Sequence, residues 1–217
     1  MKKSQVAAYY PIYLNICDRR CIVIGGGEVA LRKVEILLEY GANVEVISPE
    51  LDPELIELAK DNQIPTFVRE YKEGDLEGAF VVIAATDSDE INRQVAGEAR
   101  RRSILINVVD DAEYCDFIVP SVMRRGDITI TVSTSGKSPA LARKLRLQIE
   151  DQIGDEYIAL TELIADVRTQ IIKEGIKVSG ASWQEALDLP ALSKLLTEDG
   201  KEKAMAYLLA SLKSKQR

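Results

Sequence analysis

The 217-residue sequence predicts an α/β fold built on a doubly wound parallel sheet. Three observations support this prediction. Short apolar runs alternate with segments of helical periodicity through the first half of the chain, the first apolar run ends in three consecutive glycines, and the alternation stops near residue 113. Strands separated by helices form parallel βαβ units, and a glycine-rich turn after the first strand is typical of a Rossmann-type sheet.

We therefore predict a Rossmann domain over residues 1–112, a β-rich dimerisation segment over 113–150 and a small helical C-terminal domain over 151–217. Within the first part, the run at 79–84 contains no polar residue, as expected of a strand buried on both faces. The expected strands are 20–24, 44–47, 64–68, 79–84 and 104–109, and the expected helices are 28–40, 53–60 and 90–102.

The second part is expected to form a β extension rather than another βαβ unit. Two strands are predicted, at 117–119 and 127–132, around a turn at 124–127. The edges of so small a sheet would be exposed in a monomer, and exposed strand edges invite pairing. We therefore predict a homodimer.

Helices follow the β extension. The dipeptide Ser138-Pro139 combines a capping residue with a first-turn proline, which predicts the start of a helix over 138–153. The rest of the chain is expected to be helical, with breaks near 175–180, Pro190 and Gly200.

The composition excludes several classes of function. Lys and Arg number 28 against 35 Asp and Glu, and the net charge of −7 disfavours nucleic-acid binding. The chain has no histidine, which excludes a Ser-His-Asp triad, a histidine base and histidine metal ligands. Its three cysteines, Cys17, Cys21 and Cys115, are too few for a tetrahedral zinc site. We predict no metal site, no disulfide framework and a cytoplasmic location.

Membrane and secretion signals are also missing from the sequence. No apolar stretch approaches the roughly 20 residues that a membrane-spanning helix needs. The basic start, Met1-Lys2-Lys3, is not followed by the apolar run of a signal peptide. We therefore predict no contact with a membrane.

The segment 25–30, GGGEVA, fits the pattern G-x-G-x-x-A and lies between an expected strand and an expected helix. Gly25 permits a tight turn, Gly27 lets the backbone approach a pyrophosphate, and Ala30 allows the helix to pack closely on the strand. Free N–H groups at the start of the helix attract phosphate. The pattern predicts dinucleotide binding at Gly25, Gly26 and Gly27, and the alternative is a glycine-rich connection without a ligand.

The residues that follow the second and fourth strands favour NAD over NADP. The second strand runs into Ser48-Pro49-Glu50, where Ser48 can bond a ribose hydroxyl and Glu50 would repel a 2′-phosphate. Thr86 follows the fourth strand, at the crevice where such sheets bind ligands, and is a candidate cofactor contact. The alternative for Thr86 is the N-cap of the next helix.

An acid follows the fifth strand. Since no histidine is available, Asp110 is the best-placed residue to accept or donate a proton as a hydride leaves. Its neighbour Asp111 is the obvious competitor for that role. The alternative is structural, because loop aspartates commonly bond their own backbone.

The segment 131–139 is rich in hydroxyl groups and is surrounded by basic residues. Ser133, Thr134 and Ser135 can donate hydrogen bonds to carboxylates, and Lys137 and Arg143 can supply positive charge. The cluster predicts a site for an anionic ligand, and the alternative is a solvated helix face. Its basic members are Arg124, Arg125, Lys137, Arg143, Lys144 and Arg146.

Six motifs occur in a specific order along roughly the first 150 residues. They are Tyr10–Leu14, Ile22–Lys33, Ala84–Asp87, Asn107–Asp110, Phe117–Ser121 and Ser138–Arg143. Each is unspecific alone, but the ordered set resembles the precorrin-2 dehydrogenase / sirohydrochlorin ferrochelatase family, also known as the N-terminal module of siroheme synthase.

The resemblance implies NAD-dependent oxidation of precorrin-2 to sirohydrochlorin on the route to sirohaem, followed in some members by iron insertion. It implies a dimer whose β-rich segment interlocks with the partner chain. The acid–base aspartate of the family falls on Asp110, and its cofactor contacts fall on Glu28 and Val29 and on Pro49 and Glu50.

The resemblance also gives the basic cluster a purpose, because precorrin-2 is a polycarboxylate and a net-negative enzyme must concentrate cations locally to hold it. In place of the serine that lines the substrate pocket in the family, this chain has Thr134. Whether iron insertion occurs stays open, although the lack of histidine favours dehydrogenation. Because the chain ends at Arg217, we expect no methyltransferase domain.

Two other classes of function remain open. An NAD-binding regulatory module without catalysis would share the glycine turn but would need neither an acid nor a hydroxyl-rich loop. A different small-molecule oxidoreductase would need another substrate domain, for which the helical tail offers little catalytic material.

Overall fold

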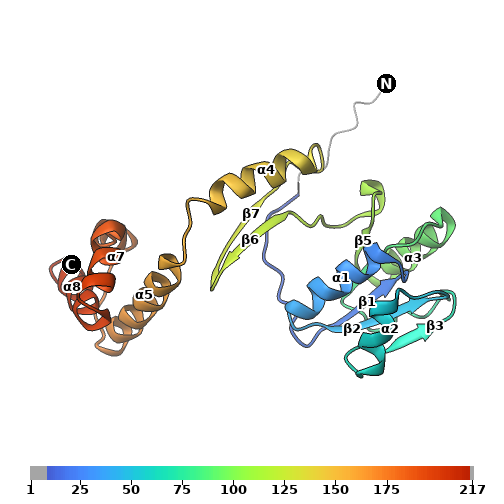
Figure 1. The fold of residues 1–217 in the computed structure, drawn as a ribbon, viewed down its shortest axis with the longest axis horizontal. Helices are drawn as coiled ribbons and strands as arrows, with labels where there is room; N and C mark the ends of the chain where they lie inside the picture. Colours follow the sequence, from blue (N-terminus) through green and yellow to red (C-terminus); the bar gives the residue numbers. More distant parts are fainter. Residues whose placement is uncertain (1–8, 216–217) are drawn as a thin grey trace. The chain divides into compact units, whose positions relative to one another are not determined.

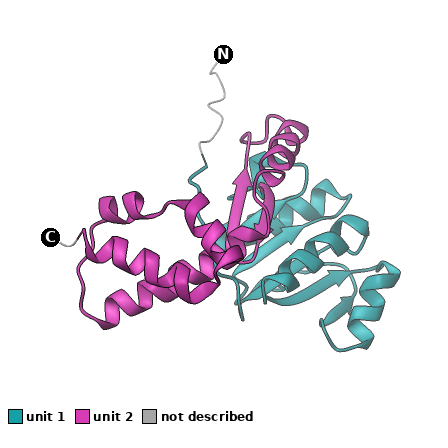
Figure 2. Ribbon diagram, turned by 60° about the vertical axis from the view of Figure 1, so that its left-hand side comes forward, with its two compact units in different colours: residues 1–119 teal, residues 120–217 magenta. Residues whose placement is uncertain are grey.

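The computed structural model describes residues 9–215, and the chain divides into two compact units, residues 1–119 and 120–217 (Figure 2). Each unit has its own hydrophobic core. The start of the chain, where we predict no signal peptide, lies outside the described residues. The finer division at residues 113 and 151 stays a prediction.

The first unit is built on a five-stranded parallel sheet with the order β3-β2-β1-β4-β5 (Figure 1). The order reverses between β1 and β4, which is the switch point of a doubly wound sheet, so the predicted fold class is confirmed. Its strands are β1 Arg20–Ile24, β2 Asn43–Ser48, β3 Thr66–Val68, β4 Val81–Ala84 and β5 Leu105–Val108. Its helices are α1 Glu28–Glu39, α2 Pro53–Lys60 and α3 Asp89–Arg102, with a 3-10 turn at Ala112–Tyr114.

Both faces of this sheet are covered, which explains why its strands are apolar at consecutive positions. Along β1, Cys21 and Val23 join the core beneath α1, while Ile22 and Ile24 join the core beneath α3. These four apolar side chains are at most 2% exposed. A strand with no solvated face cannot show the alternation of polar and apolar residues that marks a half-buried strand.

The connection from β3 to β4 is held by one ion pair and by a hydrogen bond to a buried carboxylate. The guanidinium of Arg69 donates to both carboxylate oxygens of Asp75, at 2.7 and 2.8 Å. The carboxylate of Glu98 on α3, which is 1% exposed, accepts the hydroxyl proton of Tyr71 and the Nε hydrogen of Arg102. A buried charge needs such partners, and the hydrogen bond of Tyr71 ties this connection to α3.

The second unit begins with the antiparallel hairpin of β6 Ser121–Arg125 and β7 Ile128–Val132, followed by α4 Pro139–Glu150 (Figure 1). Gly126 has φ +54, a conformation that this two-residue turn requires and that glycine adopts without strain. Met123 of β6 and Ala142 of α4 are the buried contacts of this layer. The predicted β extension and the helix after it are therefore confirmed.

The strand predicted at 117–119 is wrong, because pairing starts only at Ser121, opposite Val132. The tight turn sets the register from Arg125↔Ile128, and β7 offers no partner beyond Val132. Instead, the carbonyl of Phe117 accepts a hydrogen bond from Nδ2 of Asn107, at 3.0 Å. The apolar run at 117–119 thus belongs to the first unit.

The remaining helices are α5 Glu156–Lys173, α6 Gly180–Ala186, α7 Leu189–Glu198 and α8 Lys201–Lys213. They enclose a core of fully buried residues that includes Leu163, Val167, Leu192 and Leu208. The breaks near 175–180, Pro190 and Gly200 are where they were predicted, and Pro190 itself lies in the first turn of α7, directly after the break that follows Ala186. Among the described helices, none is long and apolar enough to cross a bilayer.

Candidate functional site

The glycine turn lies at the carboxyl edge of the first unit's sheet, at its switch point. The amide of Gly25 donates to the carbonyl of Ile47 at the end of β2, at 2.9 Å. Gly25 has φ +117, and a Cβ atom at this residue would collide with the carbonyl of Ala85 after β4. The turn is therefore clamped between β2 and β4, and only glycine fits at its first position.

The next two glycines differ in what surrounds them. The carbonyl of Gly26 accepts a hydrogen bond from the amide of Asp52 at 2.7 Å, and a Cβ atom on Gly26 would lie 2.8 Å from Oγ of Ser48. A Cβ atom on Gly27 would meet nothing within 4 Å. Helix α1 begins directly after Gly27 without a side-chain cap. An uncapped helix start beside open space suits a pyrophosphate, as the sequence predicts.

The residues around this turn form the predicted cofactor side of the site. Glu28 and Val29 are exposed in the first turn of α1. Ser48 is buried at the end of β2, and Pro49 and Glu50 are exposed beside it. These residues share one edge of the sheet because the carboxyl ends of parallel strands coincide.

Arg69 is a neighbour of this edge that sequence reasoning missed. Its amide donates to the carbonyl of Ser48 at 3.1 Å, because β3 pairs with β2 in parallel. An arginine at this position can bind a 2′-phosphate, but the guanidinium of Arg69 forms an ion pair with Asp75. The pairing of β2 with β3 is a tertiary feature, and no local motif signals it.

Thr86 lies after β4 and is tied to the protein. Its Oγ1 donates to Oδ1 of Asn92 at 2.9 Å and accepts the amide hydrogen of Ser88 at 3.2 Å. The N-cap of α3 is Ser88, whose Oγ accepts from the amide of Ile91, so the alternative of Thr86 as the cap is wrong. A cofactor contact of Thr86 stays a prediction.

Asp110 and Asp111 differ in their hydrogen bonding. Oδ1 of Asp111 accepts the amide hydrogen of Glu113 at 3.1 Å and caps the 3-10 turn. The Asp110 side chain is exposed at the carboxyl edge of β5, and its carboxylate accepts no hydrogen bond from the described residues. The structural alternative therefore describes Asp111, while Asp110 is left available to a ligand.

Lys33 of α1 is a second residue near this acid that sequence reasoning did not single out. It is half-buried and interacts electrostatically with both Asp110 and Cys115. Burial lowers the pKa of Lys33, and the charge of Arg32 lowers it further, while Asp110 opposes the shift. An amine beside the acid brings a positive charge to the edge where a polycarboxylate is expected.

The hydroxyl-rich segment forms the link between β7 and α4 in the second unit. Oγ1 of Thr134 accepts the amide hydrogen of Ser138 at 2.9 Å, and Oγ of Ser133 accepts that of Ser135 at 3.0 Å. A hydroxyl has one donor and two acceptor positions, so accepting these bonds leaves each O–H group able to donate to another acceptor. Lys137 is exposed in the same link.

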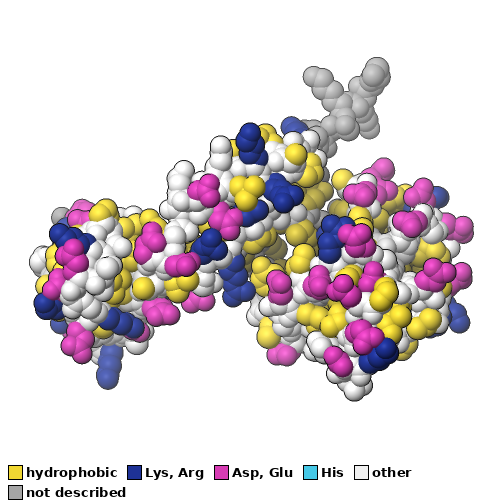
Figure 3. All heavy atoms as spheres, in the orientation of Figure 1, with side chains coloured by type: hydrophobic (Ala, Val, Ile, Leu, Met, Phe, Trp, Pro, Cys, Tyr) yellow, Lys and Arg dark blue, Asp and Glu magenta, His cyan; other side chains and the backbone are white. Residues whose placement is uncertain are grey.

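The basic cluster divides into two sets. Arg125 and Arg146 both pair with Glu150 of α4, so they serve the packing of the hairpin on the helix. Arg143 and Lys144 are exposed on α4, and Figure 3 shows basic side chains over the surface that α4 forms. Arg125 and Arg146 are thus bound within the protein, while for the exposed Arg143 and Lys144 both the anionic-ligand site and the alternative of a solvated helix face stay open.

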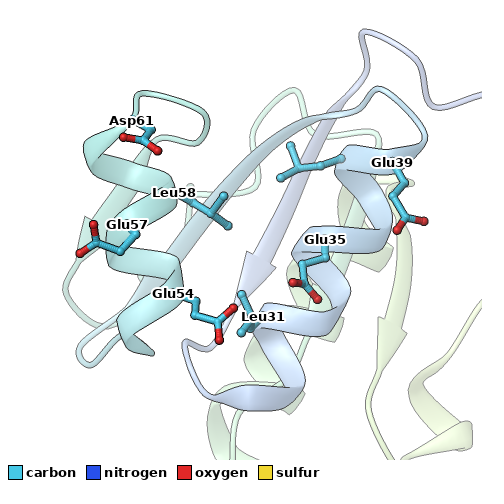
Figure 4. A pocket seen from close by; sticks show the side chains of 8 residues that line it. Leu31, Glu35, Glu39, Glu54, Glu57, Leu58 and Asp61 are labelled. Atoms are coloured by element: carbon cyan, nitrogen blue, oxygen red, sulfur yellow. The ribbon is translucent and has the colours of Figure 1, made fainter.

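A cavity of about 520 Å³ lies between α1 and α2 (Figure 4). Its lining combines apolar side chains with carboxylates, which would repel both a pyrophosphate and a polycarboxylate. This cavity is therefore not the predicted site. The lining residues are Leu31, Glu35, Leu38, Glu39, Glu54, Glu57, Leu58 and Asp61.

Together, the switch-point turn, the open helix start and the acid beyond β5 define a dinucleotide-binding protein of the Rossmann class. The family model "Putative NAD(P)-binding" matches residues 12–121, which cover this unit. The chain belongs to this NAD(P)-binding family, and the predicted class of cofactor is confirmed. A second model, "Sirohaem biosynthesis protein central", matches residues 125–152.

Curated relatives agree with the resemblance predicted from the ordered motifs. Siroheme synthase of Methylobacillus flagellatus is 44% identical over 161 residues, which are 74% of this chain and 34% of the relative. Siroheme synthase of Methylococcus capsulatus is 39% identical over 204 residues, 93% of this chain and 43% of the relative. The chain thus spans about two fifths of the length of these relatives.

A solved structure has the same fold. "SirC, precorrin-2 dehydrogenase" aligns with a TM-score of 0.68 over 95% of this chain and 100% of its own, at 22% identity. This likeness extends the fold assignment to the hairpin and the C-terminal helices.

Proposed function

We propose that this protein oxidises precorrin-2 to sirohydrochlorin with NAD, a step of sirohaem biosynthesis. The observation that carries the proposal is the exposed carboxylate of Asp110, which accepts no hydrogen bond from residues 9–215, at the same sheet edge as an open glycine turn. The siroheme synthases among the relatives support this substrate, since 93% of the chain aligns with one of them.

The reaction removes two hydrogens from the substrate. When bound, NAD supplies the hydride acceptor, which the glycine turn and the start of α1 hold by its pyrophosphate. The Asp110 carboxylate accepts the proton released with the hydride. A dehydrogenation of this kind depends chiefly on positioning and one proton acceptor, which suits a chain without histidine.

NAD, rather than NADP, is the cofactor that the ribose side favours. Glu50 is exposed beside the buried Ser48, and its charge opposes a 2′-phosphate. The nearby cation that could offset this charge, Arg69, is neutralised by Asp75. We expect a lower KM for NAD than for NADP.

The second unit supplies groups that suit a polycarboxylate. The hydroxyl groups of Ser133, Thr134 and Ser135 and the charges of Lys137 and Arg143 would bind the substrate's carboxylates. Hydrogen bonds between charged groups and carboxylates are the strong ones. The proposal includes a cytoplasmic location.

The proposed assembly is a homodimer formed through the second unit. Its two-stranded sheet has two edges, and Val122 of β6 and Leu141 and Leu145 of α4 are exposed. A two-stranded sheet alone is marginally stable, and a second copy would cover its edge. Light scattering at micromolar concentration tests this, and a monomer would contradict it.

The proposed activity is tested by anaerobic incubation with precorrin-2 and NAD while the absorbance of the tetrapyrrole is followed. We expect conversion by the intact protein, loss of at least 100-fold in kcat for Asp110→Ala, and near-normal kcat for Asp111→Ala as the matched control. Binding of NAD without conversion would favour the regulatory module instead. Sirohydrochlorin with Fe²⁺ or Co²⁺, in a parallel assay, tests iron insertion.

A further inference from the structure

The carboxylate of Asp110 is carried by a tight turn that joins β5 to the 3-10 turn. The amide of Asp111 donates to the carbonyl of Val108 at 3.3 Å, which closes a β-turn with Val109 and Asp110 at its centre. Asp110 has φ +60, in the left-handed region. This conformation is less favourable for a residue with a Cβ atom than the right-handed region, so contacts from outside the turn help to hold it.

The thiol of Cys115 supplies such contacts on both sides of the turn. Sγ accepts the amide hydrogen of Val108 at 3.2 Å, and it lies 3.2 Å from the carbonyl oxygens of Val108 and Asp111, to which its proton can be donated. The sulfur thus spans the two residues between which the turn is closed. These distances suit sulfur, whose radius exceeds that of oxygen.

Asn107 holds the same sulfur from β5. Its Nδ2 donates to Sγ of Cys115 at 3.4 Å and to the carbonyl of Phe117 at 3.0 Å. Cys115 also packs against the core beneath α3, and burial raises the pKa of its thiol. A protonated thiol is neutral, so it can donate its hydrogen to the turn without adding a charge beside the acid.

We propose that Cys115 is a positioning residue, whose thiol fixes the turn that presents the Asp110 carboxylate to the substrate. This inference rests on the proposed function. The hydrogen bonds that the described residues form with this sulfur come from Asn107, Val108 and Asp111, and none comes from the glycine turn or the start of α1. Removal of the sulfur should therefore leave NAD binding intact. Its effect is on the proton transfer alone.

The experiment compares Cys115→Val, which keeps the shape but removes the hydrogen bonds, with Cys115→Ser, which keeps a donor and an acceptor. We expect Cys115→Val to lower kcat for precorrin-2 oxidation at least tenfold, with the Kd for NAD and the KM for precorrin-2 within twofold. Cys115→Ser should recover most of that loss. Cys17→Val is the matched control, because Cys17 is an exposed cysteine of the same unit, and it should leave kcat unchanged.

A double-variant cycle separates this inference from the proposed function. If Cys115→Val does not lower the residual kcat of Asp110→Ala any further, although it lowers the kcat of the parent, Cys115 acts through Asp110. Normal kcat in Cys115→Val beside an inactive Asp110→Ala would overturn the inference alone, while full activity of Asp110→Ala would overturn the role of the acid. Should Cys115→Val not fold, Cys115→Ala serves in its place, with the same readings expected.

Discussion

The backbone carbonyl of Glu50 occupies the space that a Cβ atom of Gly26 would need. The loop after β2 therefore lies directly against the glycine turn, and Oγ of Ser48 closes the same side. By contrast, the Cα of Gly27 faces open space. The middle glycine is thus required by the protein's own packing, whereas the last one leaves room that a ligand can use.

The Gly27→Ala variant should fold normally and lose affinity for NAD. Its backbone has φ −84, which alanine adopts readily, and its methyl group would meet no protein atom. The methyl group would instead fill the space where a pyrophosphate approaches the start of α1. We expect the Kd for NAD, measured by calorimetry, to rise about tenfold or more, which is roughly 1.4 kcal/mol.

Gly180→Ala is the matched control for that experiment, because Gly180 also begins a helix and has open space around its Cα. Both variants should unfold at the temperature of the parent protein, and only Gly27→Ala should bind NAD weakly. Unchanged affinity in Gly27→Ala would contradict the placement of the pyrophosphate. Gly26→Ala should destabilise the fold by about 1–3 kcal/mol through overpacking.

Replacement of Asp111 by alanine should affect stability and leave catalysis almost unchanged. Its carboxylate caps the amide of Glu113, and loss of a cap costs about 1 kcal/mol. We expect urea unfolding to report that loss while kcat for precorrin-2 stays within threefold. A large loss of kcat in this variant, together with an active Asp110→Ala variant, would show that Asp111 rather than Asp110 is the catalytic acid.

The Arg69–Asp75 pair should make stability depend on pH in the acid range. The hydrogen bond from Arg69 holds the pKa of the Asp75 carboxyl below its usual value of 3.8. A carboxyl whose pKa is lowered by folding stabilises the protein above its unfolded pKa, and that contribution is lost as the pH falls through its folded pKa. Asp75→Asn should therefore destabilise the protein at pH 7, by about 1 kcal/mol, and matter less and less below pH 3.8.

Urea unfolding of the parent, Asp75→Asn and Arg69→Gln across this range measures the effect. Both variants should converge on the parent at low pH, because each removes the same charged pair. A stability difference that is constant from neutral to acid pH would mean that Asp75 contributes through packing alone.

The cysteines should differ sharply in reactivity. Cys21 is fully buried within the sheet, and burial raises its pKa to about 11, so at pH 8 it is a protonated and inaccessible thiol. Cys17 is exposed. We expect an aromatic disulfide reagent to label Cys17 rapidly and Cys21 only after unfolding. Cys17→Ser should remove the rapid phase, and a rapid phase that persists in the Cys17→Ser/Cys115→Ser variant, whose one remaining thiol is Cys21, would contradict the burial of Cys21.

The helices and strands of the first unit follow closely from local patterns. Pro53–Lys60 forms α2 as predicted, because Asp52 caps it and proline occupies its first turn. The strand at Arg20–Ile24 is also as predicted, since a short apolar run before a glycine-rich turn is typical of the first strand of such a sheet. The error at 117–119 has a physical cause. The carbonyl of Phe117 accepts a hydrogen bond from the side chain of Asn107 on β5, and no local pattern signals that contact.

The candidate site shows the same division. Residue types and order pointed to the glycine turn and to an acid after β5, because those features depend on the chain's local path. They favoured Asp110 and left Asp111 as its competitor, because only the folded chain shows that Asp111 accepts a hydrogen bond from the amide of Glu113. They could not single out Cys115 or Lys33, whose relevance depends on which strand and which helix lie beside the acid.

The order of residues thus determined the fold class, the cofactor class and the family, because turn chemistry, helix caps and apolar periodicity act over a few neighbouring positions. Tertiary structure alone decided which hydroxyls and carboxylates are bonded to the protein and which are left for a ligand. That distinction depends on packing between segments far apart in the chain. It is the reason that Arg69 is neutralised, Asp111 is a cap and Asp110 faces outward.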